Sequence, residues 1–342
     1  MQSDFLRTLH GVFGAFFACG SDRISGVGKS RWAHKMDAVV AVCEKRIKFL
    51  AVRLTIHRMS LYYKGKYARI YIIYKKMAAE EAACQEETNM EHITSRQNAL
   101  CTHLRKLASS VSYRRKSGEF LCDSPKLLEE ALLWKGGLRT VVCTENAVLP
   151  VLPAGVRQVT VPSDVMKSIS PAETPQGVLS VCAMPERVLP EKLDGKRYVV
   201  LDDVQDPGNV GTILRTADAF HADGMILVNA CADLYNPKTV RATMGAVFRC
   251  PVWSCSVEEL RTLLDASDLP MYGAALRSDT LDARTVDYSR CAIAIGSEGK
   301  GLSAEMLAAC DRTVLIPMSE HCESLNAAIA ATVLLWEAAR ND

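Results

Sequence analysis

Beyond residue 197 the sequence alternates between short apolar runs and amphipathic stretches. The runs predict strands, and the stretches predict the helices between them. This alternation is typical of a mostly parallel sheet covered on both faces by helices, with ligands bound at the carboxyl ends of the strands. The predicted strands are 198–204, 225–228, 271–276, 292–295 and 313–316, and the predicted helices are 210–220, 237–248, 257–264 and 325–339.

A smaller α/β unit precedes this region. A chain of 342 residues exceeds the usual size of one domain, so two folded units are expected. The first is assigned to residues 90–184, with strands at 120–122, 138–143 and 177–182 and two helices that Ser124 and Ser163 are predicted to cap. Residues 185–196 are interpreted as a linker rich in proline and charge, and 197–342 as the larger domain.

Residues 1–89 form a basic leader that is not assigned to either domain. The first 76 residues carry a net charge of +11 and the other 266 carry −9, although the whole chain carries only +2. The leader shows no sustained hydrophobic period, so no core is predicted there. One interpretation is an extension outside the folded unit that ends before Met90, and the alternative is a basic RNA-binding arm.

The cysteines indicate a reducing compartment. Thirteen are present, and none forms a Cys-x-x-Cys pair. This pattern favours reduced, buried thiols over a disulfide framework or a metal site. The apolar stretch 12–19 is too short to span a membrane and lacks the features of a signal peptide. We therefore predict a cytoplasmic protein with no metal and no membrane partner.

The loop after the first strand of the larger domain is polar and rich in glycine. It runs from Gln205 to Gly211 and opens directly into a helix, whose free backbone N–H groups make a candidate anion site. On that helix Thr212, Arg215 and Asp218 form a polar stripe. Taken alone, Arg215 is explained more simply as an exposed helical charge.

Two further loops carry candidate chemistry. Three glycines between Gly296 and Gly301 allow a ligand to approach the backbone closely, and Glu298 lies among them. A flexible connection with a solvated glutamate explains this loop equally well. In the loop before the last helix Ser324 is explained as a helix cap, whereas Asn326, one turn inside the predicted helix, is not.

Taken together, the motifs resemble the SpoU (TrmH) family of RNA 2′-O-ribose methyltransferases, members of the SPOUT superfamily. The resemblance covers about residues 198–339. A weaker similarity over 95–184 is to the family's small substrate-binding domain, although Cys122-Asp123-Ser124 stands where that domain commonly has a Glu-Gly pair. The motifs, in order, are Asn209-Val210-Gly211-Thr212-Ile213-Leu214-Arg215, Asn236-Pro237-Lys238 with Arg241-Ala242-Thr243-Met244-Gly245-Ala246, Gly296-Ser297-Glu298-Gly299-Lys300-Gly301-Leu302, and Ile316-Pro317-Met318 with Ser324-Leu325-Asn326 and Glu337.

The resemblance implies a fold and an activity. The expected fold class is α/β: a knotted (trefoil), mostly parallel sheet methyltransferase domain preceded by a small α/β substrate-binding domain. General rules of chain topology argue against a knot, so this expectation comes from the family alone. The implied activity is methyl transfer from S-adenosylmethionine to a ribose 2′-hydroxyl of structured RNA, with ribosomal RNA favoured over transfer RNA. A homodimer whose site can draw on both protomers is also implied.

The resemblance also implies roles for individual residues. Arg215 and Asn209 are the expected catalytic pair, and Glu298, Ser324 and Asn326 complete the site. Because guanidinium pKa values exceed about 12, we interpret Arg215 as a clamp on phosphate and developing alkoxide, and the proton acceptor stays unassigned. The expected cofactor contacts are Gly273, Gly296, Ile316, Met318 and Leu325.

The 266 residues that follow residue 76 carry a net negative charge, so they can bind RNA only through a local basic surface. The small domain offers such a surface. The residues predicted to contact RNA are Arg105, Lys106, Arg114, Arg115 and Lys116.

Two other functions fit parts of the sequence pattern. A dinucleotide-dependent oxidoreductase fits the sheet pattern, but no Gly-x-Gly-x-x-Gly follows the first strand of either domain. A catalytically inactive RNA-binding factor of the same fold is the second alternative. The presence of Asn209, Arg215, Glu298 and Asn326 argues against it, and a measured affinity for S-adenosylmethionine would separate the two.

Overall fold

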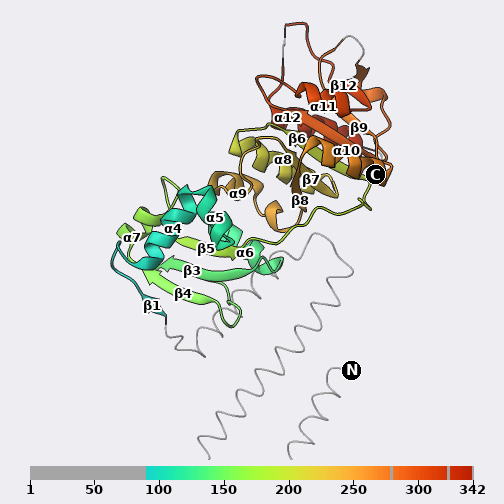
Figure 1. Ribbon diagram of the computed structural model, residues 1–342. Coiled ribbons are helices and arrows are strands. Elements are labelled where there is room, and N and C mark those ends of the chain that lie inside the picture. The colour runs from blue at the N-terminus through green and yellow to red at the C-terminus, as the bar shows by residue number, and fades with distance from the viewer. Residues whose placement is uncertain (1–89, 278–279, 322–323, 341–342) are drawn as a thin grey trace, which may run out of the picture. The chain divides into compact units, whose positions relative to one another are not determined.

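The computed structural model describes residues 90–277, 280–321 and 324–340, which fall within one compact unit of the chain and contain two sheets (Figure 1). The basic leader predicted over residues 1–89 lies outside the described residues, and its role stays a prediction.

The smaller sheet has five strands in the order β1-β4-β3-β5-β2. Strands β1, β4 and β3 run parallel, whereas β5 is antiparallel to both β3 and β2. The elements of this part are β1 (Glu91–His92), α4 (Ala99–Ser109), α5 (Val111–Ser117), β2 (Glu119–Cys122), α6 (Pro125–Leu133), β3 (Leu138–Thr144), β4 (Arg157–Val161), α7 (Ser163–Ile169) and β5 (Val178–Ala183).

The three strands predicted here are present, and Ser124 caps α6 as predicted by accepting a hydrogen bond from the Leu127 N–H. The predicted cap at Ser163 is wrong, because this residue is the first of α7 and the N-cap position is Pro162. Strand β4 was not predicted. Only Val159 and Val161 of its five residues are buried, so its apolar signal is short.

The larger sheet has seven strands in the order β10-β12-β9-β11-β6-β7-β8, and every strand pair in it is parallel. The predicted mostly parallel sheet is thereby confirmed. Its elements are β6 (Arg197–Asp202), α8 (Pro207–Ala219), β7 (Gly224–Val228), α9 (Pro237–Thr243), the 3-10 turn η1 (Ala246–Phe248), β8 (Val252–Cys255), α10 (Val257–Ser267), β9 (Met271–Ala274), β10 (Leu281–Asp282), η2 (Ala283–Thr285), β11 (Cys291–Gly296), α11 (Ala304–Ala309), β12 (Arg312–Leu315) and α12 (Ala327–Ala339).

Alternate side chains of each strand face opposite sides of this sheet. On the central strand β6, Val199 and Leu201 pack in one apolar cluster with buried residues of α8 and α12, such as Leu214. Val200 packs in a second cluster with residues of α10 and α11, such as Leu260. Helices therefore cover both faces of the sheet, as the sequence predicted.

Some helix boundaries differ from the predicted ones. Helix α9 ends at Thr243 rather than at residue 248, because Met244 and Gly245 adopt left-handed backbone angles with φ of 49° and 96°. Helix α8 begins three residues early, and Asp206 is its N-cap. Helix α10 begins with a capping box formed by Ser256 and Glu259.

The nine cysteines among the described residues are free thiols, and six of them are buried. Burial raises the pKa of Cys231 to about 11, and thus disfavours its reactive thiolate form.

Arg114 corrects the predicted RNA-binding surface. Its side chain lies in α5 but is buried, with only 1% of the residue exposed. Its Nη2 and Nε donate to Oδ2 of Asp233, at 2.6 and 2.9 Å, and its Nη1 donates to the Leu107 carbonyl at 2.7 Å. Arg114 therefore joins the small sheet's helices to the loop after β7 and is not accessible to RNA.

Two more ion pairs join these parts of the chain. Arg241 of α9 binds the buried carboxylate of Asp123, and Arg249 binds Glu130 of α6. Asp123 belongs to the stretch that departs from the family's Glu-Gly pair. Its carboxylate has a structural role in this chain because it binds α9.

Replacing Arg114 should destabilise the protein, because the substitution leaves the Asp233 carboxylate without its main partner. We expect Arg114→Ala to lower the free energy of unfolding by about 3–5 kcal/mol. The neighbouring exposed Arg115 provides the control, and Arg115→Ala should change this energy by no more than about 0.5 kcal/mol. Urea unfolding monitored by circular dichroism checks both values, and equal midpoints for the two variants would contradict the assignment.

Candidate functional site

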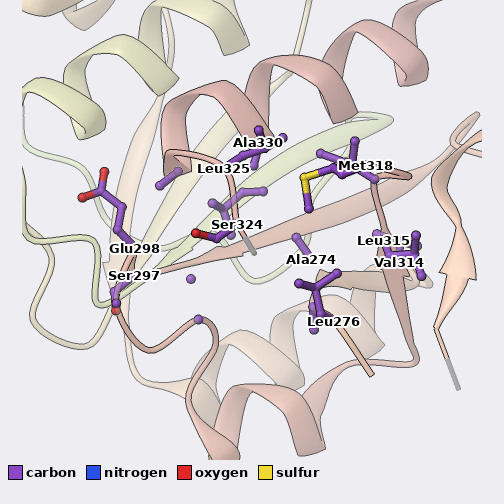
Figure 2. A pocket seen from close by; sticks show the side chains of 17 residues that line it. Ala274, Leu276, Ser297, Glu298, Val314, Leu315, Met318, Ser324, Leu325 and Ala330 are labelled. Atoms are coloured by element: carbon purple, nitrogen blue, oxygen red, sulfur yellow. The ribbon is translucent and has the colours of Figure 1, made fainter. Parts of the chain in front are cut away.

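A cavity of about 390 Å³ lies at the carboxyl ends of β9, β11 and β12 (Figure 2). This is the edge of the sheet at which the sequence predicted ligand binding, and the volume is in the range of small-molecule sites. The residues that line the cavity are Ala274, Ala275, Leu276, Ile295, Gly296, Ser297, Glu298, Gly299, Gly301, Val314, Leu315, Ile316, Met318, Ser324, Leu325, Ala327 and Ala330.

Four of the five predicted cofactor residues line this cavity, namely Gly296, Ile316, Met318 and Leu325. Gly273 does not. A Cβ at Gly273 would lie 2.7 Å from both the Cys310 sulfur and a methyl group of Leu302, so this glycine makes room for packing around α11. Its neighbours Ala274, Ala275 and Leu276 line the cavity instead, and only their position at the carboxyl end of a predicted strand could have indicated this.

The glycine loop after β11 is closed rather than loose. Backbone hydrogen bonds of 3.0 and 2.8 Å join Ser297 and Gly301 in both directions. A Cβ on Gly296 would lie only 2.1 Å from the Gly301 carbonyl carbon, and Gly301 itself has a φ of +70°. Both positions therefore require glycine, and the chain between them is held as a tight turn that carries Glu298.

Three side chains from the three predicted loops meet at the rim of the cavity. Oε1 of Glu298 accepts hydrogen bonds from the side-chain amides of Asn209 and Asn326, the latter at 2.8 Å. The Asn326 amide also lies 3.2 Å from Oδ1 of Asn209. The cluster is exposed to solvent, and it joins the start of α8, the glycine loop and the start of α12.

Asn209 is positioned by the cap of α8. Its backbone N–H donates to Oδ1 of Asp206 at 2.9 Å, while Oδ2 of Asp206 accepts from Nζ of Lys238 at 3.0 Å. The hydrogen bond from Lys238 holds the pKa of the Asp206 carboxyl below its usual value. The cap therefore stays charged at neutral pH and keeps the Asn209 side chain at the cavity rim.

The last helix begins at a different residue from the predicted one. Asn326, not Ser324, is its N-cap, because Oδ1 of Asn326 accepts from the backbone N–H groups of Ala328 and Ile329 at 3.0 and 3.3 Å. Asn326 thus caps α12 with its oxygen and binds Glu298 with its nitrogen. Ser324 lies on the cavity wall instead (Figure 2).

Arg215 lies on the exposed face of α8, whereas Ile213, Leu214 and Ala217 of the same helix are buried. No hydrogen bond or ion pair of its side chain is found in the part of the chain that the structure describes. The structure therefore leaves Arg215 available to an external anion, but it does not place this residue in the cavity wall.

The other predicted RNA contacts lie at the surface. Lys106, Arg115 and Lys116 are exposed, and the Lys106 ammonium lies 5.4 Å from the centre of the Tyr113 ring. Arg105 is half-buried and donates to the Arg96 carbonyl at 2.8 Å.

Comparison with known proteins identifies the family. A profile described as the SpoU rRNA Methylase family matches residues 196–336, and one described as the MRM3-like substrate binding domain matches 98–180. The chain is 34% identical to the 23S rRNA (guanosine(2553)-2′-O)-methyltransferase RlmP of Bacillus subtilis, over 72% of this chain and 98% of that protein. The chain belongs to the SpoU rRNA methylase family.

Two further proteins resemble the chain, one in sequence and the other in both sequence and fold. Human mitochondrial rRNA methyltransferase 3 is 26% identical over 78% of this chain and 79% of its own length. The crystal structure of an AdoMet-bound rRNA methyltransferase from Sinorhizobium meliloti is 30% identical and has a TM-score of 0.66, covering 74% of this chain and 98% of that one. The resemblance stated from the motifs is thereby confirmed.

The two roles of Asn326 can be separated by substitution. Serine keeps an oxygen that can cap α12 but removes the amide that binds Glu298, whereas alanine removes both. We expect Asn326→Ala to lower the free energy of unfolding by about 0.5–2 kcal/mol and Asn326→Ser by only a few tenths. Guanidinium unfolding followed by tryptophan fluorescence measures both, and a serine variant as unstable as the alanine variant would contradict the capping role.

Proposed function

We propose that this chain transfers the methyl group of S-adenosylmethionine to a ribose 2′-hydroxyl of ribosomal RNA. The observation that carries the proposal is the meeting of Asn209, Glu298 and Asn326 at the rim of an apolar cavity. The choice of ribosomal RNA rests on the relatives, which include a 23S rRNA 2′-O-methyltransferase and a mitochondrial rRNA methyltransferase.

The test is to incubate the purified chain with S-adenosylmethionine and an unmodified 23S rRNA transcript and to map 2′-O-methylated riboses. The same map of RNA from cells with and without the gene identifies the nucleotide. An inactive RNA-binding factor would bind the transcript without transferring a methyl group.

The cavity fits S-adenosylmethionine. Its walls are mostly apolar, and its glycine turn is closed because the Gly301 backbone fills the space that a Cβ at Gly296 would occupy. Gly296, Ile316, Met318 and Leu325 would hold the cofactor. When bound, S-adenosylmethionine supplies a methyl group on a positively charged sulfur. A solved relative bound to AdoMet supports this assignment.

Two glycines of the same loop provide a matched test of the cofactor site. A Cβ at Gly296 would collide with the Gly301 backbone, whereas nothing lies within 4 Å of one at Gly299. We expect Gly296→Ala to weaken S-adenosylmethionine binding by about 10- to 100-fold, because the turn must open to make room for the alanine side chain. Gly299→Ala should bind within about threefold of the original chain. Titration calorimetry decides, and equal affinities would contradict the assignment.

Arg215 is proposed to clamp the phosphate beside the target ribose and to stabilise the oxygen as its proton is lost. Its exposed side chain, without a partner in the described part of the chain, is compatible with that role. Asn209 and Asn326 orient the Glu298 carboxylate at the cavity rim, and Ser324 lies on the cavity wall.

Loss of the clamp should reduce the rate without affecting the fold. We expect Arg215→Ala to lower the single-turnover rate by roughly 10²–10³, with unchanged S-adenosylmethionine affinity. Arg215→Lys keeps the charge but loses the planar fork, so partial activity is expected. Arg312, an exposed arginine at the amino end of β12, is the control, and Arg312→Ala should react at the full rate. A fully active Arg215→Ala variant would contradict the clamp and show that Arg215 is only an exposed charge on the helix surface.

RNA capture is assigned to Arg105, Lys106, Arg115 and Lys116 of the small domain, because Arg114 is buried. Removing the charges of Arg115 and Lys116 should lessen the salt dependence of RNA binding by up to about one slope unit per lost phosphate contact. S-adenosylmethionine affinity should not change. The control removes two exposed lysines of the linker, Lys192 and Lys196, and should keep the original slope. Filter binding of the 23S rRNA transcript across salt concentrations measures both, and identical slopes would contradict the assignment.

The knot and the homodimer are proposed from the family resemblance. The chain after β12 reaches the glycine loop after β11, where Asn326 binds Glu298. On α12 the apolar side chains of Ile329, Val333 and Trp336 are exposed at helical spacing, which supports a partner subunit there.

No helix in the described part of the chain has the length and apolar character needed to cross a membrane. The cytoplasmic location stays a prediction.

A further inference from the structure

The cavity contains a single titratable side chain among the residues that the structure describes, and it is Glu298. The remaining lining residues are glycines, aliphatic residues, one methionine and two serines. A ribose hydroxyl that attacks a methyl group from this cavity must lose its proton nearby. We propose that Glu298 accepts that proton, an inference that rests on the proposed methyl transfer.

The two oxygens of Glu298 have different surroundings. Oε1 accepts hydrogen bonds from both Asn209 and Asn326. Within residues 90–277, 280–321 and 324–340 no hydrogen bond or ion pair involves Oε2. The two amides therefore fix the orientation of the carboxylate through one oxygen, while the other oxygen keeps its lone pairs for a substrate hydroxyl.

The backbone around Glu298 is fixed as well. The turn from Ser297 to Gly301 is closed by two backbone hydrogen bonds, and Ser303 beyond it donates to the buried carboxylate of Asp202 at 2.6 Å. A base held this way needs little reorganisation when a substrate arrives. Because Glu298 is exposed, the accepted proton can then pass to water.

The atoms and charges of the step balance. The ribose oxygen forms a bond to the methyl carbon, the bond between that carbon and sulfur breaks, and its electron pair stays on sulfur. The hydroxyl proton passes to Oε2 of Glu298, which becomes a neutral carboxylic acid. The proton becomes far more acidic as the new bond forms, so a carboxylate is a sufficient base. Arg215 remains the clamp in this step, because a guanidinium is not a general base in proteins.

A purely positioning role for Glu298 makes a different prediction. In that case its oxygen only receives the two asparagine amides, and glutamine offers an oxygen of the same shape at the same place. Glu298→Gln should then keep most of the activity. If Glu298 is the base, this variant should lose about 10²–10⁴ in single-turnover rate, since the amide cannot accept the proton.

The experiment measures single-turnover methylation of the 23S rRNA transcript by the full chain and its variants. Glu298→Ala opens space for an added carboxylate, so formate or acetate should restore part of its rate in proportion to concentration, whereas chloride at equal ionic strength should not. Asn326→Ala is the control and should gain nothing from formate. Calorimetry provides a readout apart from activity, and Glu298→Gln should bind S-adenosylmethionine within about threefold of the original chain.

The outcomes separate the two proposals. An original chain that methylates the transcript, with an inactive Glu298→Gln variant and carboxylate rescue of Glu298→Ala, supports the assignment. An active Glu298→Gln variant, or a Glu298→Ala variant that added carboxylates do not rescue, overturns it and leaves the proposed function intact. An original chain that methylates no ribosomal RNA overturns both.

Discussion

The buried carboxylate of Asp202 holds the loops of the functional site in place. It is the last residue of β6, the strand between β11 and β7, and none of it is exposed. Its Oδ1 accepts from the Asn229 side chain and its Oδ2 from the Ser303 backbone, each at 2.6 Å. A buried charge is stable only when its oxygens have donors, so the loops after β7 and β11 are both bound to the centre of the sheet.

This constraint divides the site into two regions with different chemistry. Ser303 is the N-cap of α11, so the end of the glycine loop cannot move without exposing a helix terminus and a buried carboxylate. The loop therefore presents Glu298 at a fixed point, where amides from the starts of α8 and α12 meet it. Below this polar rim, side chains such as Leu276 and Val314 form apolar walls. Polar side chains at the rim can exchange protons and hydrogen bonds with a substrate, and the apolar cavity excludes water from a bound ligand.

The sequence motifs contain all the members of this cluster, but they predict Ser324 and not Asn326 as the helix cap. Ser324 and Asn326 are both good capping residues, and the assignment depended on a helix start that was placed two residues early. Gly273 was expected at the cofactor, yet its missing side chain makes room for Cys310 and Leu302. Arg114 was counted with Arg115 and Lys116 as one basic patch. Its partner Asp233 is 119 residues away, and nothing local in the sequence indicates that contact.

The sequence by itself determined the parallel α/β architecture, the loops that carry the chemistry and the family motifs. These properties follow from local periodicity and from the order of residues in short segments. The tertiary structure alone decided that Arg114 is buried, that Gly273 faces α11 and that one asparagine both caps a helix and binds Glu298. Burial and hydrogen bonding depend on partners such as Asn209 and Glu298, which lie 89 residues apart and meet only when the sheet brings its loops to one edge.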